Sequence, residues 1–492
     1  MTLVSFGYLL LITAGIFLYY LCPQKFQWVI LLGLSVWFYV AVATSPYTII
    51  YLMMSTVVAF LVSNSLEKSK NPKFLVVIAI VLNIGIWVFL KIGGYLSESI
   101  VVSLGIGYYT LQVIGYVLDC HWGNIKPQKN ILKLFLFTCF FPQMIAGPIS
   151  RYERLVSMYE GHEFSYENLT HGAQRILWGF CKKLILAERV GIVINTIWSA
   201  PESYGGCYAW VALILYPIQM YADFSACMDI VIGTAECFGV KLTENFNNPF
   251  FSRTIQEFWR RWHISLGEWA KDFVLYPLLK SNFMVTTGKK LRNRFGKNTG
   301  KFITTAIGML VLWFVIGVWH GGVKYVIGVS LWYWILLMLG EAFRNKFAGW
   351  KTKMKIQDES FSWHLLQAAR TYLIYAIGAV FFRAQNVREA GKFLGSLLDA
   401  WLKKEHNFNI FFDGSLNTLG ISDTDWIIIL VMVALLIVVA VLREKYGFAR
   451  IWVDKQILPF RWFVWIGLLL FVVIAGKYGA EYDSANFIYQ IF

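Results

Sequence analysis

Long apolar runs separated by short polar segments extend along the whole chain. A helix rises about 1.5 Å per residue, so roughly 20 apolar residues cross a hydrocarbon core of about 30 Å. The runs predict about eleven to thirteen helices in an all-α, polytopic transmembrane bundle, which we expect to form one domain over residues 1–492. Some runs, notably 131–147, are candidates for re-entrant or interfacial segments. The runs are 3–21, 27–44, 47–64, 74–91, 99–118, 131–147, 172–199, 207–239, 302–320, 323–342, 365–382, 426–442 and 461–476.

Composition agrees with a membrane protein. Of the 492 residues, 58% are hydrophobic and 15% are charged, whereas soluble proteins carry about 25% charged residues. This excludes an ordinary soluble enzyme, a secreted disulfide scaffold and a disordered chain. The seven cysteines include no Cys-x-x-Cys pair, so we expect buried thiols and neither a disulfide nor a metal site.

The excess of basic residues predicts the orientation of the bundle. Lys and Arg number 44 against 29 Asp and Glu, a net charge of +15. Such an excess gathers in the cytoplasmic loops of membrane proteins, so we expect no nucleic-acid partner. Segments 280–301 and 344–355 are strongly basic and are expected in the cytoplasm, whereas 399–425 is expected outside. A basic cytoplasmic face would also suit an anionic donor, such as a coenzyme A thioester or an acidic carrier protein.

Three segments carry candidate chemistry. The first, residues 140–152, contains Pro142, Gln143, Gly147 and Pro148. Two prolines and a glycine break a helix, and broken backbone at membrane depth occurs only where protein or a cavity covers it. The segment is therefore either a re-entrant element that lines a cavity or a simple helix end at the interface.

The second segment, residues 216–229, places polar side chains inside an apolar run. Gln219 and Asp223 are four residues apart and share a helix face. Asp229 lies about 240° round the helix from Asp223, so the two carboxylates face different directions. Together with Ser225, these residues are either a functional site or polar contacts that hold helices together.

The third segment, residues 258–273, is rich in aromatic residues and contains His263. At about 100° per residue its apolar side chains fall within about 80° of one another, so we expect an amphipathic helix at the membrane surface. His263 lies at the edge of the apolar arc and can point inward. The apolar side chains are Phe258, Trp262, Leu266, Trp269 and Phe273, opposite Arg260, Glu268 and Lys271.

A second histidine, His320, ends an uncharged apolar stretch that begins at Phe302. It is preceded by Trp319 and followed by Gly321 and Gly322, which permit close approach of backbone or substrate. Ionisable residues in apolar surroundings are functional candidates by default. From the residues alone, His320 is either catalytic or a satisfied core histidine.

Together these blocks resemble the membrane-bound O-acyltransferase (MBOAT) family, in its branch that O-acetylates alginate. The resemblance rests on FFPQMIAGPISRYERL, on YADFSACMDIVIGTAECFG with the following ENFNNPFFSRTIQEFWRRWHISLGEWAKDFVLYPL, and on GVWHGG, within about 140–322. It implies the MBOAT fold with a tunnel through the membrane, a catalytic His320 acting as general base, and a functional His263 that hydrogen-bonds the thioester oxygen or orients the acyl group. We expect Arg260, Arg261 and Trp262 at the donor, and Pro142, Gln143, Gly147, Gln219, Asp223, Ser225 and Trp319 along the tunnel.

The resemblance also implies a reaction. An acyl group, acetyl in this branch, would pass from acetyl-CoA or a phosphopantetheine carrier protein to an exported cell-envelope polysaccharide or a partner protein. The enzyme would span the bacterial plasma membrane among its lipids, without a permanently bound cofactor or metal, and would work with an extracytoplasmic hydrolase-like acetyltransferase. The alternatives are D-alanyl transfer to teichoic acid, in a related branch, and a transporter or flippase, which would leave the two histidine motifs unexplained.

The final residues, 487–492, read FIYQIF. They resemble an FIYFQF-like motif of related bacterial systems, in which the tyrosine is thought to relay the acyl group, and they depart from it after the tyrosine. Tyr489 is therefore a candidate acyl relay, and the alternative is a hydrophobic tail that anchors the terminus.

Overall fold

The computed structural model describes residues 2–96, 102–403 and 407–478. Within these ranges the regular structure is helical, and the one β-type pairing is an isolated bridge between Phe246 and Trp262. The predicted all-α fold is confirmed. Tyr489 and the tail 487–492 lie outside the described residues.

Among the described residues, nine helices are long and apolar enough to cross a membrane. They correspond to nine of the predicted runs, so the chain is a multi-pass membrane protein. The other four runs give shorter or interrupted helices. Runs 3–21 and 99–118 give 16-residue helices, run 131–147 gives a nine-residue helix, and run 172–199 is divided by a π-helix.

The chain divides into two compact units. Of the described residues, unit 1 comprises those within 2–184, Asp223–Glu244 and 450–478, and unit 2 comprises those within Ile185–Ala222 and Asn245–Ala449. Three helical elements contain a boundary between the units: the π-helix η4 (Cys181–Ala187), α10 (Cys207–Cys237) and α23 (Ala449–Asp454), of which only Ala449 belongs to unit 2.

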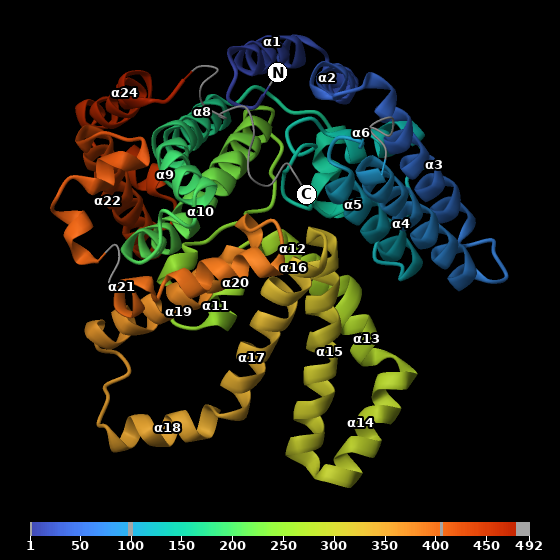
Figure 1. Cartoon of the computed structure of the whole chain (residues 1–492). Coiled ribbons are helices and arrows are strands. Elements are labelled where there is room, and N and C mark those ends of the chain that lie inside the picture. Colours follow the sequence, from blue (N-terminus) through green and yellow to red (C-terminus); the bar gives the residue numbers. More distant parts are fainter. Residues whose placement is uncertain (1, 97–101, 404–406, 479–492) are drawn as a thin grey trace. The chain divides into compact units, whose positions relative to one another are not determined.

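Unit 1 is organised around α5, in which nearly every residue is buried. Helices α3, α4 and α5 pack side by side, and α6 packs against α2 and α3 (Figure 1). Unit 1 contains α1 (Phe6–Leu21), η1 (Gln24–Phe26), α2 (Gln27–Val42), η2 (Pro46–Thr48), α3 (Ile49–Ser65), α4 (Pro72–Leu96), α5 (Ile106–His121), α6 (Ile131–Cys139), α7 (Tyr152–Leu155), η3 (Val156–Tyr159), α8 (Tyr166–Phe180), most of α23 (Ala449–Asp454) and α24 (Leu458–Ala475).

Unit 2 contains a helical hairpin of α14 and α15, which lie side by side and antiparallel in Figure 1. It contains α9 (Glu188–Ser199), η5 (Pro249–Phe251), α11 (Ile255–Arg261), α12 (Ile264–Ala270), η6 (Lys271–Leu275), α13 (Tyr276–Lys280), α14 (Asn282–Phe295), α15 (Lys297–His320), α16 (Val323–Tyr325), η7 (Val326–Leu331), α17 (Trp332–Ala342), α18 (Arg344–Lys353), α19 (Phe361–Arg383), α20 (Val387–Ser396), α21 (Asp399–Leu402), η8 (Phe408–Phe411), η9 (Ser415–Leu419) and α22 (Asp423–Tyr446).

Local signals set the ends of the α14–α15 hairpin. The Ser281 side chain accepts a hydrogen bond from the Met284 amide and so caps α14. Gly296, at φ 84°, separates the two helices, and Gly321, at φ 146°, ends α15 directly after His320. L-residues rarely adopt such positive φ values. His320 is thus the last residue of a helix long enough to span a membrane.

The predicted amphipathic helix over residues 258–273 is wrong. Helix α11 ends at Arg261, Trp262 is extended, His263 has a left-handed backbone, and α12 begins at Ile264. The interruption arises because this backbone pairs with a distant segment: Asn247 N–H donates to the Arg261 carbonyl at 2.9 Å, and Ile264 N–H donates to the Asn245 carbonyl at 3.0 Å. The spacing of apolar residues within 258–273 does not reveal that pairing, so it could not predict the interruption.

Candidate active site

The backbone at His263 is unusual for a residue with a side chain. Its φ is 47° and its ψ is 51°, a conformation that costs an L-residue roughly 1–2 kcal/mol. Residues in such conformations concentrate at functional sites, where surrounding contacts hold them. Here the Phe246–Trp262 bridge and the two backbone hydrogen bonds beside it hold the turn.

The buried Asn245 side chain defines the protonation of the His263 ring. Asn245 Oδ1 accepts hydrogen bonds from the Ser265 backbone N–H at 3.1 Å and from Ser265 Oγ at 3.0 Å, and it lies 3.3 Å from His263 Nδ1. A backbone N–H can only donate, so this Asn245 atom is an acceptor and His263 Nδ1 carries the proton. In the neutral ring, Nε2 then holds the lone pair.

Burial keeps that ring neutral. His263 is 4% exposed, and desolvation lowers the pKa of His263 to about 3. A buried imidazole resists protonation because the charged form loses its hydration. At neutral pH, His263 therefore presents an uncharged ring whose Nε2 can accept a hydrogen bond.

His320 lies among three aromatic rings of the same unit. Its ring centroid is 4.8 Å from Trp319, 5.1 Å from Phe382 and 6.0 Å from Tyr325. The Trp319 ring also approaches His263, at 6.1 Å between centroids. Trp319 therefore lies between the two histidines, and the structure brings together His263, Trp319 and His320. We call these three residues with Tyr325 and Phe382 the histidine pocket.

Two contacts brace the elements around His320. A Cβ at Gly317 would lie 2.0 Å from Ser330 Oγ, so only glycine lets α15 approach η7 this closely. Lys324 Nζ donates to the Ala384 carbonyl at 2.6 Å and lies 4.7 Å from the Tyr325 ring centroid. Sequence reasoning missed Asn245, Lys324 and Phe382. Lys324 follows the second histidine motif by two residues, whereas Asn245 and Phe382 lie farther from either motif in the chain.

The three residues predicted to bind the donor do not form one surface. Trp262 is a core residue, stacked on Phe258 at 5.5 Å between ring centroids. Arg261 pairs with Glu257 at 2.9 Å and also with Glu444. Arg260 is exposed. The packing of Trp262 in the core explains its presence structurally. Donor binding by Arg260 and Arg261 stays a prediction.

In unit 1, the predicted break after residue 139 is present. Helix α6 ends at Cys139, and residues 140–150 are non-helical and buried, with turns over 141–146. Gly147 N–H donates to the Gln143 carbonyl at 2.8 Å, and a Cβ at Gly147 would lie 2.3 Å from Gln143 Cα. The broken backbone, which includes Pro142, is thus covered by protein, as membrane-depth turns require. The role of these residues along a tunnel stays a prediction.

Asp223, Ser225 and Asp229 join a network of buried ion pairs in unit 1. Lys183 Nζ lies 2.7 Å from Asp223 Oδ1, and both side chains are nearly fully buried. Lys182 Nζ lies 2.7 Å from Ser225 Oγ and 2.6 Å from Asp229 Oδ2. Asp223 thus pairs with Lys183, and Asp229 pairs with Lys182. We call the whole set the charged cluster: Arg175, Lys182, Lys183, Asp223, Asp229 and Glu244.

The position of two lysines in the sequence indicates part of this cluster. Lys182 and Lys183 lie in an apolar run, where ionisable residues are costly and must find partners. Arg175 completes the set by pairing with Asp229 at 2.9 Å and with Glu244 at 2.6 Å. Gln219 belongs to unit 2, where its side chain packs against Gly191. A Cβ added at Gly191 would lie only 2.8 Å from Gln219 Nε2. The role of Gln219 along a tunnel stays a prediction.

Comparison with known proteins gives these residues a family context. Residues 127–288 match the model of the membrane-bound O-acyltransferase family, a range that includes His263 and ends before His320. The probable alginate O-acetylase AlgI of Pseudomonas syringae pv. tomato is 29% identical over 304 residues, covering 62% of this chain and 53% of that protein.

Two further relatives carry different names. The teichoic acid D-alanyltransferase of Bacillus subtilis is 31% identical over 266 residues, covering 52% of this chain and 62% of that protein. The peptidoglycan O-acetyltransferase of Helicobacter pylori is 26% identical over 326 residues, covering 61% of this chain and 57% of that protein. The matched part of this chain thus spans about half to three-fifths of each relative's length. Residues 127–288 of this chain are similar to the membrane-bound O-acyltransferase family.

Proposed function

We propose that this chain is an O-acyltransferase that moves an acetyl group from a cytoplasmic thioester to a hydroxyl. The observation that carries the proposal is the histidine pocket: two buried histidines, His263 and His320, approach the same Trp319 ring in one unit. The match of residues 127–288 to the family model supports acyl transfer over a transporter.

His320 is proposed as the general base. An alcohol attacks a thioester slowly until its proton is removed. The His320 imidazole takes the hydroxyl proton while the oxygen attacks the acyl carbon. The carbon–sulfur bond then breaks, and the leaving thiolate takes the proton from the imidazolium, which restores the neutral base. The rings of Trp319, Tyr325 and Phe382 around His320 limit water, which would otherwise hydrolyse the thioester.

The protonation of His263 changes the role that we expect for it. A donor to the thioester oxygen would need a proton on Nε2, but the contact with Asn245 favours the proton on Nδ1. We therefore propose that His263 orients the donor by accepting a hydrogen bond at Nε2. The amide N–H groups of a phosphopantetheine arm are suitable partners, and acetyl-CoA and a carrier protein both present that arm.

For the acceptor we propose an exported cell-envelope polysaccharide, reached with an extracytoplasmic acetyltransferase partner from a bacterial plasma membrane. The names of the relatives include alginate and peptidoglycan acetylation, which support an acetyl group and a polysaccharide. D-alanyl transfer to teichoic acid is the second candidate, because the Bacillus subtilis relative that is 31% identical carries that name.

The test is acyl transfer by the purified full chain in lipid vesicles. With labelled acetyl-CoA, we expect His320→Ala to lower thioester cleavage by about 10²–10⁴-fold. His364→Ala is the control: this histidine is half-buried on α19, where it contacts Arg253. Near-normal cleavage by a folded His320→Ala protein would refute the general-base role. Cleavage of a D-alanyl carrier thioester, with acetyl-CoA inert, would favour the second candidate.

We also propose that Tyr489 relays the acyl group across the membrane. A cytoplasmic thioester and an external polymer are separated by about 30 Å of hydrocarbon, so a tunnel or a relay must connect them. A phenol flanked by Phe487, Ile488 and Ile491 can enter an apolar tunnel mouth.

Tyr489→Phe keeps the shape of the tail and removes the nucleophile. We expect the variant to abolish acylation of the polymer in cells while labelled acetyl-CoA still binds to the purified protein. Unchanged polymer acylation in cells would exclude the relay, and His320 would then serve the final acceptor or a separate partner directly.

A further inference from the structure

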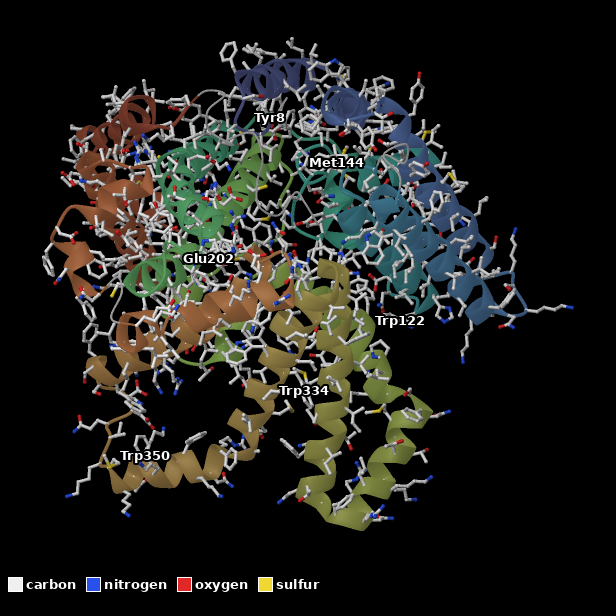
Figure 2. The ribbon with its side chains drawn as sticks, in the orientation of Figure 1. Tyr8, Trp122, Met144, Glu202, Trp334 and Trp350 are labelled. Atoms are coloured by element: carbon white, nitrogen blue, oxygen red, sulfur yellow. The ribbon has the colours of Figure 1, made fainter. Side chains whose placement is uncertain are left out.

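Helix α18 (Arg344–Lys353) has no buried residue. A ten-residue helix is about 15 Å long, and such short helices are only marginally stable in water without packing partners. Figure 1 shows α18 running across the end of α17. Figure 2 labels Trp350 on this helix. A helix of this kind needs something outside the unit to stabilise it.

The connections of α18 assign it to one membrane surface. It begins two residues after the spanning segment Val323–Ala342 ends, and it is followed by the spanning segment Phe361–Arg383. The chain therefore leaves the membrane, forms α18 and re-enters the same face. Only residue 343 lies between the first span and α18, and seven residues, 354–360, lie between α18 and the next span, so the helix stays close to that membrane surface.

The side chains of α18 form an apolar stripe. Phe343, Phe347, Trp350 and Met354 recur at the spacing of one helix face, and at about 100° per residue they fall within about 60°. The Phe343 and Phe347 rings lie 6.3 Å apart, so they do share that face. All four side chains are 39% to 59% exposed. An exposed stripe of this size would be unfavourable in water.

Basic residues flank the stripe on both sides. On the same wheel Lys346 and Lys353 lie along one edge, and Arg344 and Lys351 lie along the other. Residues 344–355 contain five basic residues and no acidic residue. Arg344 contacts Glu341 at 3.5 Å, and Lys351 pairs with Asp358 at 2.7 Å, so Lys346 and Lys353 form the edge outside those two ion pairs.

We propose that α18 is an interfacial anchor that binds anionic phospholipid headgroups, with its apolar stripe inserted among the acyl chains. Aromatic residues on one face with lysines at its borders are typical of helices that lie in the interface plane. The lysine stems extend along the apolar face while their ammonium groups reach the phosphates. Anionic lipid attracts such a segment by roughly fivefold for each basic residue near the surface. The proposal does not depend on acyl transfer.

The test measures how deeply single positions of α18 lie in the bilayer. Phe347→Cys carries a nitroxide on the stripe, and Thr352→Cys carries one on the opposite face as the matched control. The full chain is reconstituted into vesicles of phosphatidylcholine with or without phosphatidylglycerol. Wild-type protein treated with the same reagent gives the signal from the native cysteines, six of which are buried.

With phosphatidylglycerol present, we expect the label at position 347 to be relaxed by oxygen, which partitions into hydrocarbon. The label at position 352 should be relaxed by a water-soluble nickel chelate. Lys346→Gln with Lys353→Gln should weaken the preference for phosphatidylglycerol by about 25-fold, fivefold for each lysine. High salt should weaken it in the same direction.

Three results would overturn the proposal. The label at position 347 could remain accessible to nickel in phosphatidylglycerol vesicles. Its depth could be equal in the two lipid mixtures, which would exclude an anionic headgroup. It could be shielded only when the protein density rises or when an acidic carrier protein is added, which would make the stripe a protein-docking surface instead.

Discussion

The two units bury polar groups in opposite ways. In unit 1 the charged cluster places each carboxylate within 3 Å of a lysine or arginine nitrogen, as with Lys183 and Asp223 at 2.7 Å. In unit 2 the histidine pocket surrounds His320 with aromatic rings, and burial keeps His263 neutral. Lys183 and Asp223 of the charged cluster and His320 of the histidine pocket all lie within apolar runs of the sequence.

The difference separates structural polar residues from reactive ones. A buried ion pair is satisfied by its partner, and breaking it leaves an unbalanced charge. A neutral imidazole keeps a lone pair that can take a proton from a substrate. A polar residue within an apolar run is therefore only a candidate, and its partners decide which kind it is.

The largest expected effect comes from breaking one pair of the charged cluster. Asp223→Ala leaves the Lys183 ammonium buried without its carboxylate, which should lower the free energy of unfolding by about 3–5 kcal/mol. The measurement is unfolding in mixed detergent micelles. Replacing both residues, as Lys183→Met with Asp223→Leu, should recover most of the loss. A folded Asp223→Ala protein of normal stability would show that the cluster is not structural.

The next effect is a dependence of stability on pH that comes from the histidine pocket. The pKa of His263 is about 3 in the folded chain against an ordinary value of 6.5. Between these values the unfolded chain binds a proton that the folded chain does not, so acidification from pH 6.5 towards 3 favours unfolding.

The check compares wild type with His263→Gln at pH 6.5, 5.5 and 4.5. The wild type should lose up to about 1.4 kcal/mol per pH unit more than the variant. If both proteins lost stability equally, His263 would already be protonated in the folded state.

The smallest effect sharpens the roles of the two histidines. A neutral hydrogen bond contributes about 1 kcal/mol, so His263→Ala should lower thioester cleavage by about fivefold to tenfold, far less than His320→Ala. Asn245→Ala should give a similar loss, because His263 Nδ1 would lose the acceptor at 3.3 Å that orients the ring. Kinetics at saturating donor provide the measurement. A loss for His263→Ala as large as that for His320→Ala would assign both residues to proton transfer.

Several features were predictable because they depend on neighbours along the chain. In the described part of the chain, nine apolar runs form helices long enough to span a membrane, the segment with Pro142 and Pro148 is not helical, and His320 ends a helix before Gly321. Helix length, proline and glycine act within a few residues, so one sequence suffices to find them.

The features that were missed depend on residues far apart in the chain. The break at His263 follows from pairing with Asn245 and Asn247, about 15 residues earlier. The partners of Asp223 and Asp229 are some 40 to 54 residues distant. The stripe of α18 was visible in its spacing, but its exposure on a helix between two spans required the structure.

The central claim is that the histidine pocket of unit 2 does the chemistry and that the charged cluster of unit 1 supports the fold. The most direct measurement is labelled acetyl-CoA cleavage by His320→Gln and by Lys183→Met/Asp223→Leu, at equal amounts of folded protein in vesicles. The account predicts a loss of at least about 100-fold for His320→Gln and near wild-type cleavage for the double variant. Cleavage retained by His320→Gln and lost by the double variant would contradict it.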